Sequence, residues 1–459
     1  MDVTRAEEEC PVRRISLSDR TTVPREDPAI ETVDRRTANG SPSSMNPGDA
    51  HVGDLLDRFW KAARVPNTLE RIADPGRVGR ATCDPWAWSA RGSVFGFPLR
   101  RLDPQRAFIF SVDGSPSTAA IGFHQIGPDD NMISKIAIEE AFSLPDLIGK
   151  TKDYTPAFRV DELNSQLLDI HAQRLRDMDT YGVDFMVLSL TSPGPQDQSD
   201  PKKAEALAIR SNDYLAAEIA KNPKRFGGFA SLSMHDPHVA AEEAKRAIKE
   251  LKLLGLIVND FQSCGDDGEG AIFYDQPEWD AFWQTVQELD VPFYIHPRLT
   301  TPNVQSLFLK GRPWLGASAY FFSVGVSLHV LGIYCNGVFD RFPDLQIIIG
   351  HMGEHLPYQL WRIDHRLQYV QKGRGLPAKK TLTEVFKTNL RITTSGHFGT
   401  SALLYAIQEL GIDRVMFSID YPYDMISHGC TWLDSITELT EEQKTQLASG
   451  NAKKALKLA

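Results

Sequence analysis

The chain has 459 residues, of which 42% are hydrophobic and 24% charged, with a formal net charge of -10. This composition is typical of a soluble globular protein and excludes a disordered or fibrous chain. The acidic balance, without any basic cluster, argues against a nucleic-acid partner. No apolar stretch approaches the ~18 residues that a membrane span needs, so no membrane partner is expected. The five cysteines are scattered without a C-x-x-C pair, which fits free thiols and a cytoplasmic location.

Residues 1–131 differ in composition from the remainder of the chain. They hold 12 of the 28 prolines, and runs such as Thr37–Asp49 (TANGSPSSMNPGD) are typical of turns and linkers. Neither a strand period nor a helix period persists there. We therefore expect a mostly disordered N-terminal extension over 1–131, followed by a catalytic domain over 132–459.

From residue 132 onward, short β-branched runs alternate with amphipathic helical stretches, the pattern of βα units around a parallel sheet. Eight strands are predicted, at Lys135–Glu140, Val183–Thr191, Phe226–Met234, Leu256–Phe261, Val291–Pro297, Gln346–His351, Leu390–Gly396 and Arg414–Asp420. Eight is the strand number of a (β/α)8 barrel, which takes about 250 residues, so the predicted fold is an α/β TIM barrel. A doubly wound open sheet is the alternative, but no glycine-rich phosphate loop follows an early strand.

Polar residues stand at the carboxyl ends of several predicted strands, where a TIM barrel carries its active site. They are Glu139-Glu140, Asn259-Asp260, His296, His351 and Asp420. One such residue alone is more often a loop-capping or buried hydrogen-bonding group, but several at one barrel mouth favour a site. Imidazole and carboxylate groups without thiolates suit a divalent cation such as Zn²⁺, Mn²⁺ or Mg²⁺, and three protein ligands would leave positions open for catalysis.

The spacing of these residues in the sequence predicts only some of their positions relative to one another. By alternation along the first strand, Glu139 shares a face with Ala141 and Glu140 shares the other with Phe142, and the spacing does not show which pair enters the barrel. Glu354 follows His351 by three residues, which places the two on one side of a helical turn and suits an acid–base pair. The alternative for Glu354 is a first-turn carboxylate favoured by the helix N-terminus.

These residues lie in motifs that resemble the amidohydrolase superfamily. Within it, the chain is similar to the branch of metal-dependent, non-oxidative aromatic decarboxylases acting on 2,3-dihydroxybenzoate, γ-resorcylate and salicylate. The resemblance covers about 132–459. It depends on the motifs at Lys135–Phe142 (KIAIEEAF), Ile295–Arg298 (IHPR), Gly350–Arg366, Ile392–Gly396 (ITTSG) and Phe417–Tyr423 (FSIDYPY).

The resemblance implies one divalent metal ion and no organic cofactor. The ligands that it implies are Glu139, His296 and Asp420. Most hydrolases of the superfamily begin with a H-x-H pair, whereas this chain has Glu139-x-Ala141. Some related decarboxylases carry histidine at the position of Ala141, so water is expected to complete the metal shell.

The resemblance also implies roles in catalysis and substrate binding. It assigns His351 and Glu354 to an acid–base pair and Arg362 to the pocket; the alternative for Arg362 is to cap its helix or bridge subunits. From the chemistry we predict that Asp420 is the proton donor and that this pair supplies its proton. His296 and Phe398 are the other candidate substrate-binding residues. His397 and Asp424 stand where Asn and Glu are expected in close relatives, which leaves the substrate preference open.

The implied activity is conversion of an ortho-hydroxybenzoate to a phenol and CO₂. The ortho hydroxyl donates electron density to the ring carbon that bears the carboxylate, so that this carbon can accept a proton. One alternative is a metal-dependent hydrolase of an ester, lactone or amide on the same barrel, against which the missing H-x-H pair counts. Another is a non-catalytic binding protein, which only Ala141 suggests. The expected partners are a small aromatic carboxylate and further copies of the chain in a dimer or tetramer.

Overall fold

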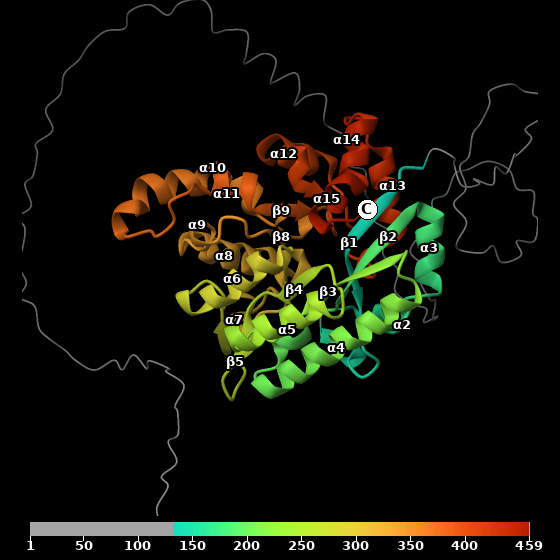
Figure 1. Ribbon diagram of the computed structural model, residues 1–459, viewed down its shortest axis with the longest axis horizontal. Helices are drawn as coiled ribbons and strands as arrows, with labels where there is room; N and C mark the ends of the chain where they lie inside the picture. The colour runs from blue at the N-terminus through green and yellow to red at the C-terminus, as the bar shows by residue number, and fades with distance from the viewer. Residues whose placement is uncertain (1–131, 154, 459) are drawn as a thin grey trace, which may run out of the picture. The chain divides into compact units, whose positions relative to one another are not determined.

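The computed structural model describes residues 132–153 and 155–458, so the extension expected over 1–131 lies outside the described residues. Eight parallel strands form one sheet in the order β1-β2-β3-β4-β7-β8-β9-β10 (Figure 1). Their bounds are Lys135–Phe142 (β1), Val183–Leu190 (β2), Phe226–Ser231 (β3), Gly255–Asn259 (β4), Phe293–His296 (β7), Ile347–Ile349 (β8), Leu390–Thr393 (β9) and Val415–Met416 (β10). The predicted TIM barrel is confirmed.

Helices connect successive strands and cover the outside of the sheet (Figure 1). The α-helices are Val160–Leu168 (α2), Gln173–Tyr181 (α3), Pro201–Lys221 (α4), Pro237–Lys249 (α5), Asp280–Leu289 (α6), Pro302–Phe308 (α7), Phe321–Cys335 (α8), Val338–Arg341 (α9), Leu356–His365 (α10), Leu382–Thr388 (α11), Thr400–Leu410 (α12), Ile426–Ser435 (α13), Glu441–Thr445 (α14) and Asn451–Leu456 (α15). Asp200 and Asp236 cap α4 and α5 by accepting backbone N–H bonds. A hairpin of β5 (Gln262–Cys264) and β6 (Gly270–Ile272) lies in a stretch where no strand was predicted. No helix in the described residues is long and apolar enough to cross a membrane.

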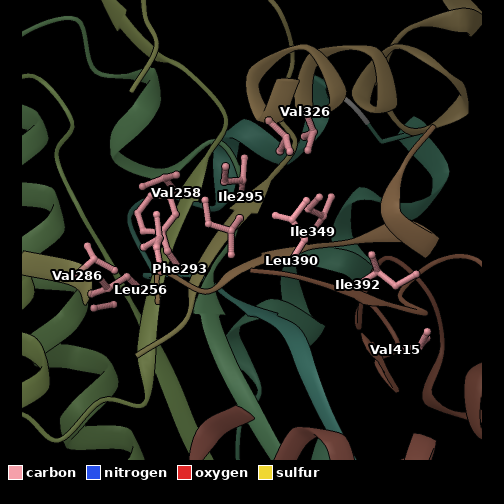
Figure 2. Close-up of a cluster of buried hydrophobic side chains, with 14 of the residues drawn as sticks. Leu256, Val258, Val286, Phe293, Ile295, Val326, Ile349, Leu390, Ile392 and Val415 are labelled. Atoms are coloured by element: carbon pink, nitrogen blue, oxygen red, sulfur yellow. The ribbon is translucent and has the colours of Figure 1, made fainter. Parts of the chain in front are cut away.

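Apolar side chains pack on both faces of the strands. Between the sheet and the helices, residues such as Phe293 and Ile349 pack near Val286 of α6 and Val326 of α8 (Figure 2). A separate cluster, here called the inner apolar layer, consists of Ile136, Ile138, Val187, Phe229, Ile257, Tyr294, Ile348, Met416, Ala452 and Leu456. It combines residues from strands around the barrel with two from α15. The barrel interior is therefore filled by side chains, as expected for this fold.

A bulge in β1 decides which of its polar residues face the barrel mouth. Between Ala137 and Glu140 the pairing advances three residues on β1 but only two on β2. Ile136 and Ile138 belong to the inner apolar layer, and beyond the bulge Glu139 and Ala141 line a cavity at the carboxyl end. Of the two pairs left open by the sequence, Glu139 and Ala141 therefore point inward.

The barrel closes between β1 and the segment that follows β10. The Ala141 N–H donates to the Tyr421 carbonyl at 2.7 Å. The Ser418 hydroxyl oxygen accepts the N–H of Glu139 at 2.8 Å, and Glu140 accepts bonds from Ser418 and its neighbours. Side chains thus replace a regular strand ladder at this seam.

Candidate metal centre

Four side chains converge at the carboxyl ends of the strands and form what we call the ligand cluster. They are Glu139 on β1, His296 on β7, His351 after β8 and Asp420 after β10, each offering one atom, and these atoms lie within 4.8 Å of one another. Glu139 Oε1 is 3.5 Å from His296 Nε2 and 3.6 Å from His351 Nε2, and the latter nitrogen is 3.7 Å from Asp420 Oδ2. Donors about 3–4 Å apart suit one cation with ligand distances of about 2.1 Å.

The two oxygens of Glu139 have different surroundings. Oε2 accepts hydroxyl hydrogen bonds from Tyr294, Thr393 and Ser395. Oε1 is buried and has no hydrogen-bond partner among the described residues. A buried carboxylate oxygen without a partner is costly, and a cation is the partner that its position among two imidazoles and a carboxylate fits. Gly350 permits this approach, since a Cβ there would lie 2.8 Å from Oε1.

Both imidazoles are oriented with Nε2 toward Glu139. His296 Nδ1 lies 2.8 Å from the Pro297 carbonyl and 3.0 Å from Asn259 Oδ1. Because a carbonyl only accepts, Nδ1 carries the proton and the Nε2 lone pair is available to a metal. His351 Nδ1 lies 2.8 Å from Glu354 Oε1. Such outer partners are what orient metal-binding histidines.

Burial and mutual charge shift the pKa values in this cluster. Burial lowers the pKa of His296. Burial also acts to lower the pKa of His351, but the nearby carboxylates, Glu354 foremost, outweigh it and hold that pKa well above its usual range. For Asp420, burial raises the pKa to about 7 although the His351 hydrogen bond opposes the shift. Metal-free, the cluster therefore retains protons that a cation would displace.

A cavity of about 960 Å³ opens beside the ligand cluster. This is at the upper end of the ~300–1,000 Å³ range of small-molecule sites. Its lining includes Ser192, His296, Arg298, His351, Glu354, His397, Asp420, Tyr423 and Asp424. The two residues that depart from the related motifs, His397 and Asp424, thus face the place where a substrate would lie.

A smaller cavity adjoins Ala141. Its volume is about 10 Å³, room for about one water molecule. Glu139, His296 and Asp420 line it together with Ala141. The inner end of the site therefore has space where relatives can carry a further side chain.

Two predicted substrate-binding residues lie away from the cavity lining. Arg362 is exposed on α10, and the Phe398 ring packs against Trp432 at 5.5 Å. Asp260 also faces elsewhere, since its carboxylate accepts a hydrogen bond from His329 at 2.9 Å. The packing of these helices and loops, rather than the local sequence, sets these positions.

The hydroxyl groups that hold Glu139 were not predicted. Tyr294 precedes His296 by two residues, so strand alternation places both on the same face. Thr393 and Ser395 alternate in the same way within the ITTSG motif. A period of two counted back from His296 would have indicated Tyr294, whereas no predicted ligand lies on the strand of Thr393 and Ser395.

A parallel barrel with imidazole and carboxylate donors at the carboxyl ends of its strands has the architecture of enzymes that bind a catalytic metal. The chain belongs to the amidohydrolase family, whose model matches residues 166–458.

Individual relatives are similar over nearly their whole length. The γ-resorcylate decarboxylase of Polaromonas sp. (strain JS666) is 41% identical over 329 residues, which cover 71% of this chain and 99% of the relative. Decarboxylase orsB of Emericella nidulans is 35% identical, over 65% of this chain and 89% of its own.

Solved structures agree with this similarity. A 2,6-dihydroxybenzoate decarboxylase complexed with 2,6-dihydroxybenzoate matches with a TM-score of 0.69 at 41% identity, over 71% of this chain and 100% of that one. The dihydroxybenzoic acid decarboxylase of Polaromonas sp. JS666, with bound manganese and the inhibitor 2-nitroresorcinol, matches with a TM-score of 0.68 at 41% identity, over 71% and 98%.

Proposed function

We propose that this chain is a metal-dependent, non-oxidative decarboxylase that converts an ortho-hydroxybenzoate to the corresponding phenol and CO₂. The observation that carries the proposal is Glu139 Oε1, a buried oxygen with no hydrogen-bond partner among the described residues, within the ligand cluster. The similarity to γ-resorcylate decarboxylases supports a substrate of the 2,6-dihydroxybenzoate type.

We assign metal binding to Glu139, His296 and Asp420, and we assign His351 Nε2, which borders the same point, to proton supply. A bound divalent cation would supply the positive charge that holds the carboxylate and ortho-hydroxyl oxygens of the substrate. The donor set suits Zn²⁺, Mn²⁺ or Mg²⁺, and manganese in a relative makes Mn²⁺ the first ion to test. The chemistry needs no organic cofactor, because the ortho hydroxyl itself activates the ring carbon.

Asp420 borders the cavity, where its carboxyl group delivers a proton to the ring carbon that bears the carboxylate. The electron pair of the breaking C–C bond then returns to the ring, CO₂ leaves and aromaticity is restored. His351 Nε2, 3.7 Å from Asp420 Oδ2, resupplies the proton. Glu354, 2.8 Å from Nδ1, stabilises the charged imidazole during this transfer.

The lining of the cavity supports His296, His397 and Asp424 as substrate contacts. Arg362 and Phe398 are left out of these contacts because neither lines the cavity. Fixed side chains around the ring would position its reacting carbon against Asp420.

We further propose that residues 132–459 form the catalytic domain and that the chain acts in the cytoplasm as a homo-oligomer. Tyr358, Trp361 and Tyr369 on and after α10 are exposed by 74–81%, which supports self-association because water-exposed aromatic groups of this kind often mark interfaces. The free thiols of Cys335 and Cys430 fit a reducing compartment.

Anaerobic turnover of the purified full chain tests the reaction. We expect equal amounts of phenol and CO₂ from at least one of 2-hydroxy-, 2,3-dihydroxy- and 2,6-dihydroxybenzoate. A chelator should abolish release and one divalent ion should restore it. Metal binding without release from any of these acids would contradict the proposal, and ester or lactone cleavage in the same assay would favour hydrolysis.

Asp420→Asn tests the proton donor. We expect loss of turnover, because the amide cannot deliver a proton to the ring. Turnover at the wild-type rate by metal-loaded Asp420→Asn would remove Asp420 from that role.

A further inference from the structure

Glu140, the neighbour of Glu139 on β1, makes bonds that the proposed reaction does not use. Its side chain is fully buried. Oε1 accepts the Ser418 hydroxyl at 2.8 Å and the Ile419 N–H at 3.0 Å, and Oε2 accepts the Tyr421 N–H at 2.8 Å. Both carboxylate oxygens are therefore occupied by groups from one short segment after β10.

The bonded segment is the one that presents Asp420 to the ligand cluster. Ile419 and Tyr421 flank Asp420 directly, so Glu140 holds the backbone on both sides of it. Asp420 has a φ of +76°, in the left-handed region that ordinary side chains disfavour. Such a conformation persists only where the surroundings hold it, which here includes two bonds to a single carboxylate.

The same carboxylate joins the two segments that carry Glu139 and Asp420. No strand ladder pairs β1 with β10 in the described residues. The Ser418 hydroxyl that donates to Glu140 also accepts the Glu139 N–H at 2.8 Å. Glu140 and Ser418 thus help to set the separation of the Glu139 and Asp420 backbones, together with the Ala141 N–H bond to the Tyr421 carbonyl at 2.7 Å.

Arg174 supports this arrangement from behind. It is fully buried and donates to the Ala141 carbonyl at 2.6 Å. Its guanidinium carbon lies 4.8 Å from the centre of the Tyr421 ring. A positive charge therefore contacts both segments that Glu140 joins, which favours a carboxylate between them.

We infer that Glu140 is a positioning residue for the metal centre, fixing Asp420 relative to Glu139 without contacting metal or substrate. The inference rests on the proposed function in one respect, the role of Asp420 as a ligand. Residues that hold metal ligands typically change metal affinity about 10–100-fold when replaced.

Glu140→Gln in the full chain is the test. Whichever oxygen the amide nitrogen replaces, an N–H or O–H donor then faces a second donor, so Asp420 loses part of its support. We expect Mn²⁺ to dissociate about 10–100-fold more readily, measured by competition with a chromogenic chelator. Excess Mn²⁺ should restore much of the turnover, because Glu140 takes no part in the chemistry.

Asn451→Ala is the matched control. Asn451 is also buried and donates to the carbonyls of Ile412 and Val415, both at 2.7 Å, at the opposite end of β10. Its loss should lower the urea midpoint while leaving Mn²⁺ affinity unchanged. If Glu140→Gln is destabilised like Asn451→Ala and binds Mn²⁺ like wild type, Glu140 is structural only and the inference is overturned.

Should Glu140→Gln fail to fold, Ser418→Ala removes one donor of the same group and is expected to weaken Mn²⁺ binding several-fold. Unchanged affinity in Ser418→Ala would then overturn the inference. If the wild-type chain binds no divalent ion, both the proposed function and the inference about Glu140 are overturned. If the wild-type chain binds Mn²⁺, the variants test the inference about Glu140 alone.

Discussion

The two ends of the same barrel strands have opposite chemistry. At the amino end, β1, β7 and β10 contribute Ile136, Tyr294 and Met416 to the inner apolar layer, which is buried almost completely. At the carboxyl end, the same strands lead to Glu139, His296 and Asp420. A few residues along each strand therefore separate hydrophobic packing from charged groups held close together.

The backbone differs between the two ends as well. His351, Met352 and Asp420 have φ values of 48°, 59° and 76°, and all follow the carboxyl ends of strands. Positive φ in such residues costs roughly 1–3 kcal/mol each, as does an unpartnered buried oxygen such as Glu139 Oε1. We conclude that the amino end stabilises the barrel while the carboxyl end is stabilised less and is arranged for function.

The largest expected effect comes from removing the ligand with the unpartnered oxygen. Glu139→Gln should lose the metal and about 10³-fold in turnover, because a neutral amide is a poor ligand and several kcal/mol of charge stabilisation disappear. The free energy of unfolding of the metal-free variant should stay close to that of wild type or rise. Metal content, turnover and urea unfolding of the chelator-treated protein are the measurements.

Phe229→Ala is the control, because it changes hydrophobic packing at the amino end and leaves the ligand cluster intact. Phe229 is fully buried in the inner apolar layer, with its ring 6.0 Å from that of Tyr294. Its truncation should cost about 3–5 kcal/mol of stability and leave metal affinity in the folded fraction unchanged. The comparison between the two ends is wrong if Glu139→Gln is destabilised as much as Phe229→Ala.

The second prediction uses pH to separate the two ends. Burial raises the pKa of Asp420 to about 7 and that of Glu140 to about 8. Metal-free folded protein thus retains protons that the unfolded chain releases above about pH 4–5, so its unfolding free energy falls as pH rises through about 7 and 8. Chelator-treated protein should have a lower urea midpoint at pH 9 than at pH 6.

Two controls test whether this pH dependence comes from groups at the carboxyl end of the strands. Asp420→Asn should remove the part of the slope near pH 7, because the amide does not titrate, and leave the part near pH 8 that comes from Glu140. Saturating Mn²⁺ should reduce the slope, because a cation binds the deprotonated ligands. The inner apolar layer contributes no slope, since Tyr294 is its only ionisable residue and burial raises that pKa further above 10. A slope near pH 7 that is unchanged in Asp420→Asn would place its origin elsewhere in the barrel.

The barrel was predictable because each strand and helix has a local sequence pattern, and the packed structure keeps these elements in the same alternating order. The eighth strand shows the limit: it was predicted over Arg414–Asp420, but only Val415 and Met416 pair with β9. From Ser418 onward the chain bonds to the Glu140 side chain instead. Pairing through a side chain that lies far away in the sequence has no local signature.

For the candidate site, the strand-end positions of the proposed ligands were predictable, but the inward face of β1 was not. Simple alternation from Ile136 and Ile138 would turn Glu140 into the barrel. The bulge adds one residue and turns Glu139 inward instead. Its place is set by pairing with β2, which a single sequence does not contain. The positions of Arg362 and Phe398 depend in the same way on how their helices and loops pack.

The prediction with the smallest expected effect concerns Ala141. It tests whether water occupies a metal-ligand position at the inner end of the site. Ala141 shares the inward face with Glu139 and borders the cavity of about 10 Å³ that Glu139, His296 and Asp420 also line. Ala141→His would replace the water of this space with an imidazole nitrogen beside the ligand cluster. We expect metal affinity to rise about tenfold or more, because a protein nitrogen replaces an exchangeable water. Chelator competition measures the affinity, and water-proton relaxation by bound Mn²⁺ counts exchangeable waters.

Ala141→Val tests whether an effect of Ala141→His on metal affinity comes from a new metal ligand or only from filling the cavity. It occupies the same cavity without a nitrogen, so it should remove the water yet leave Mn²⁺ affinity unchanged or weaker. If histidine and valine change the affinity equally, the cavity lies outside the metal shell. If only histidine tightens binding, Ala141 is the position at which this chain leaves a ligand site to water, and the carboxyl end of β1 is less completely filled than its amino end.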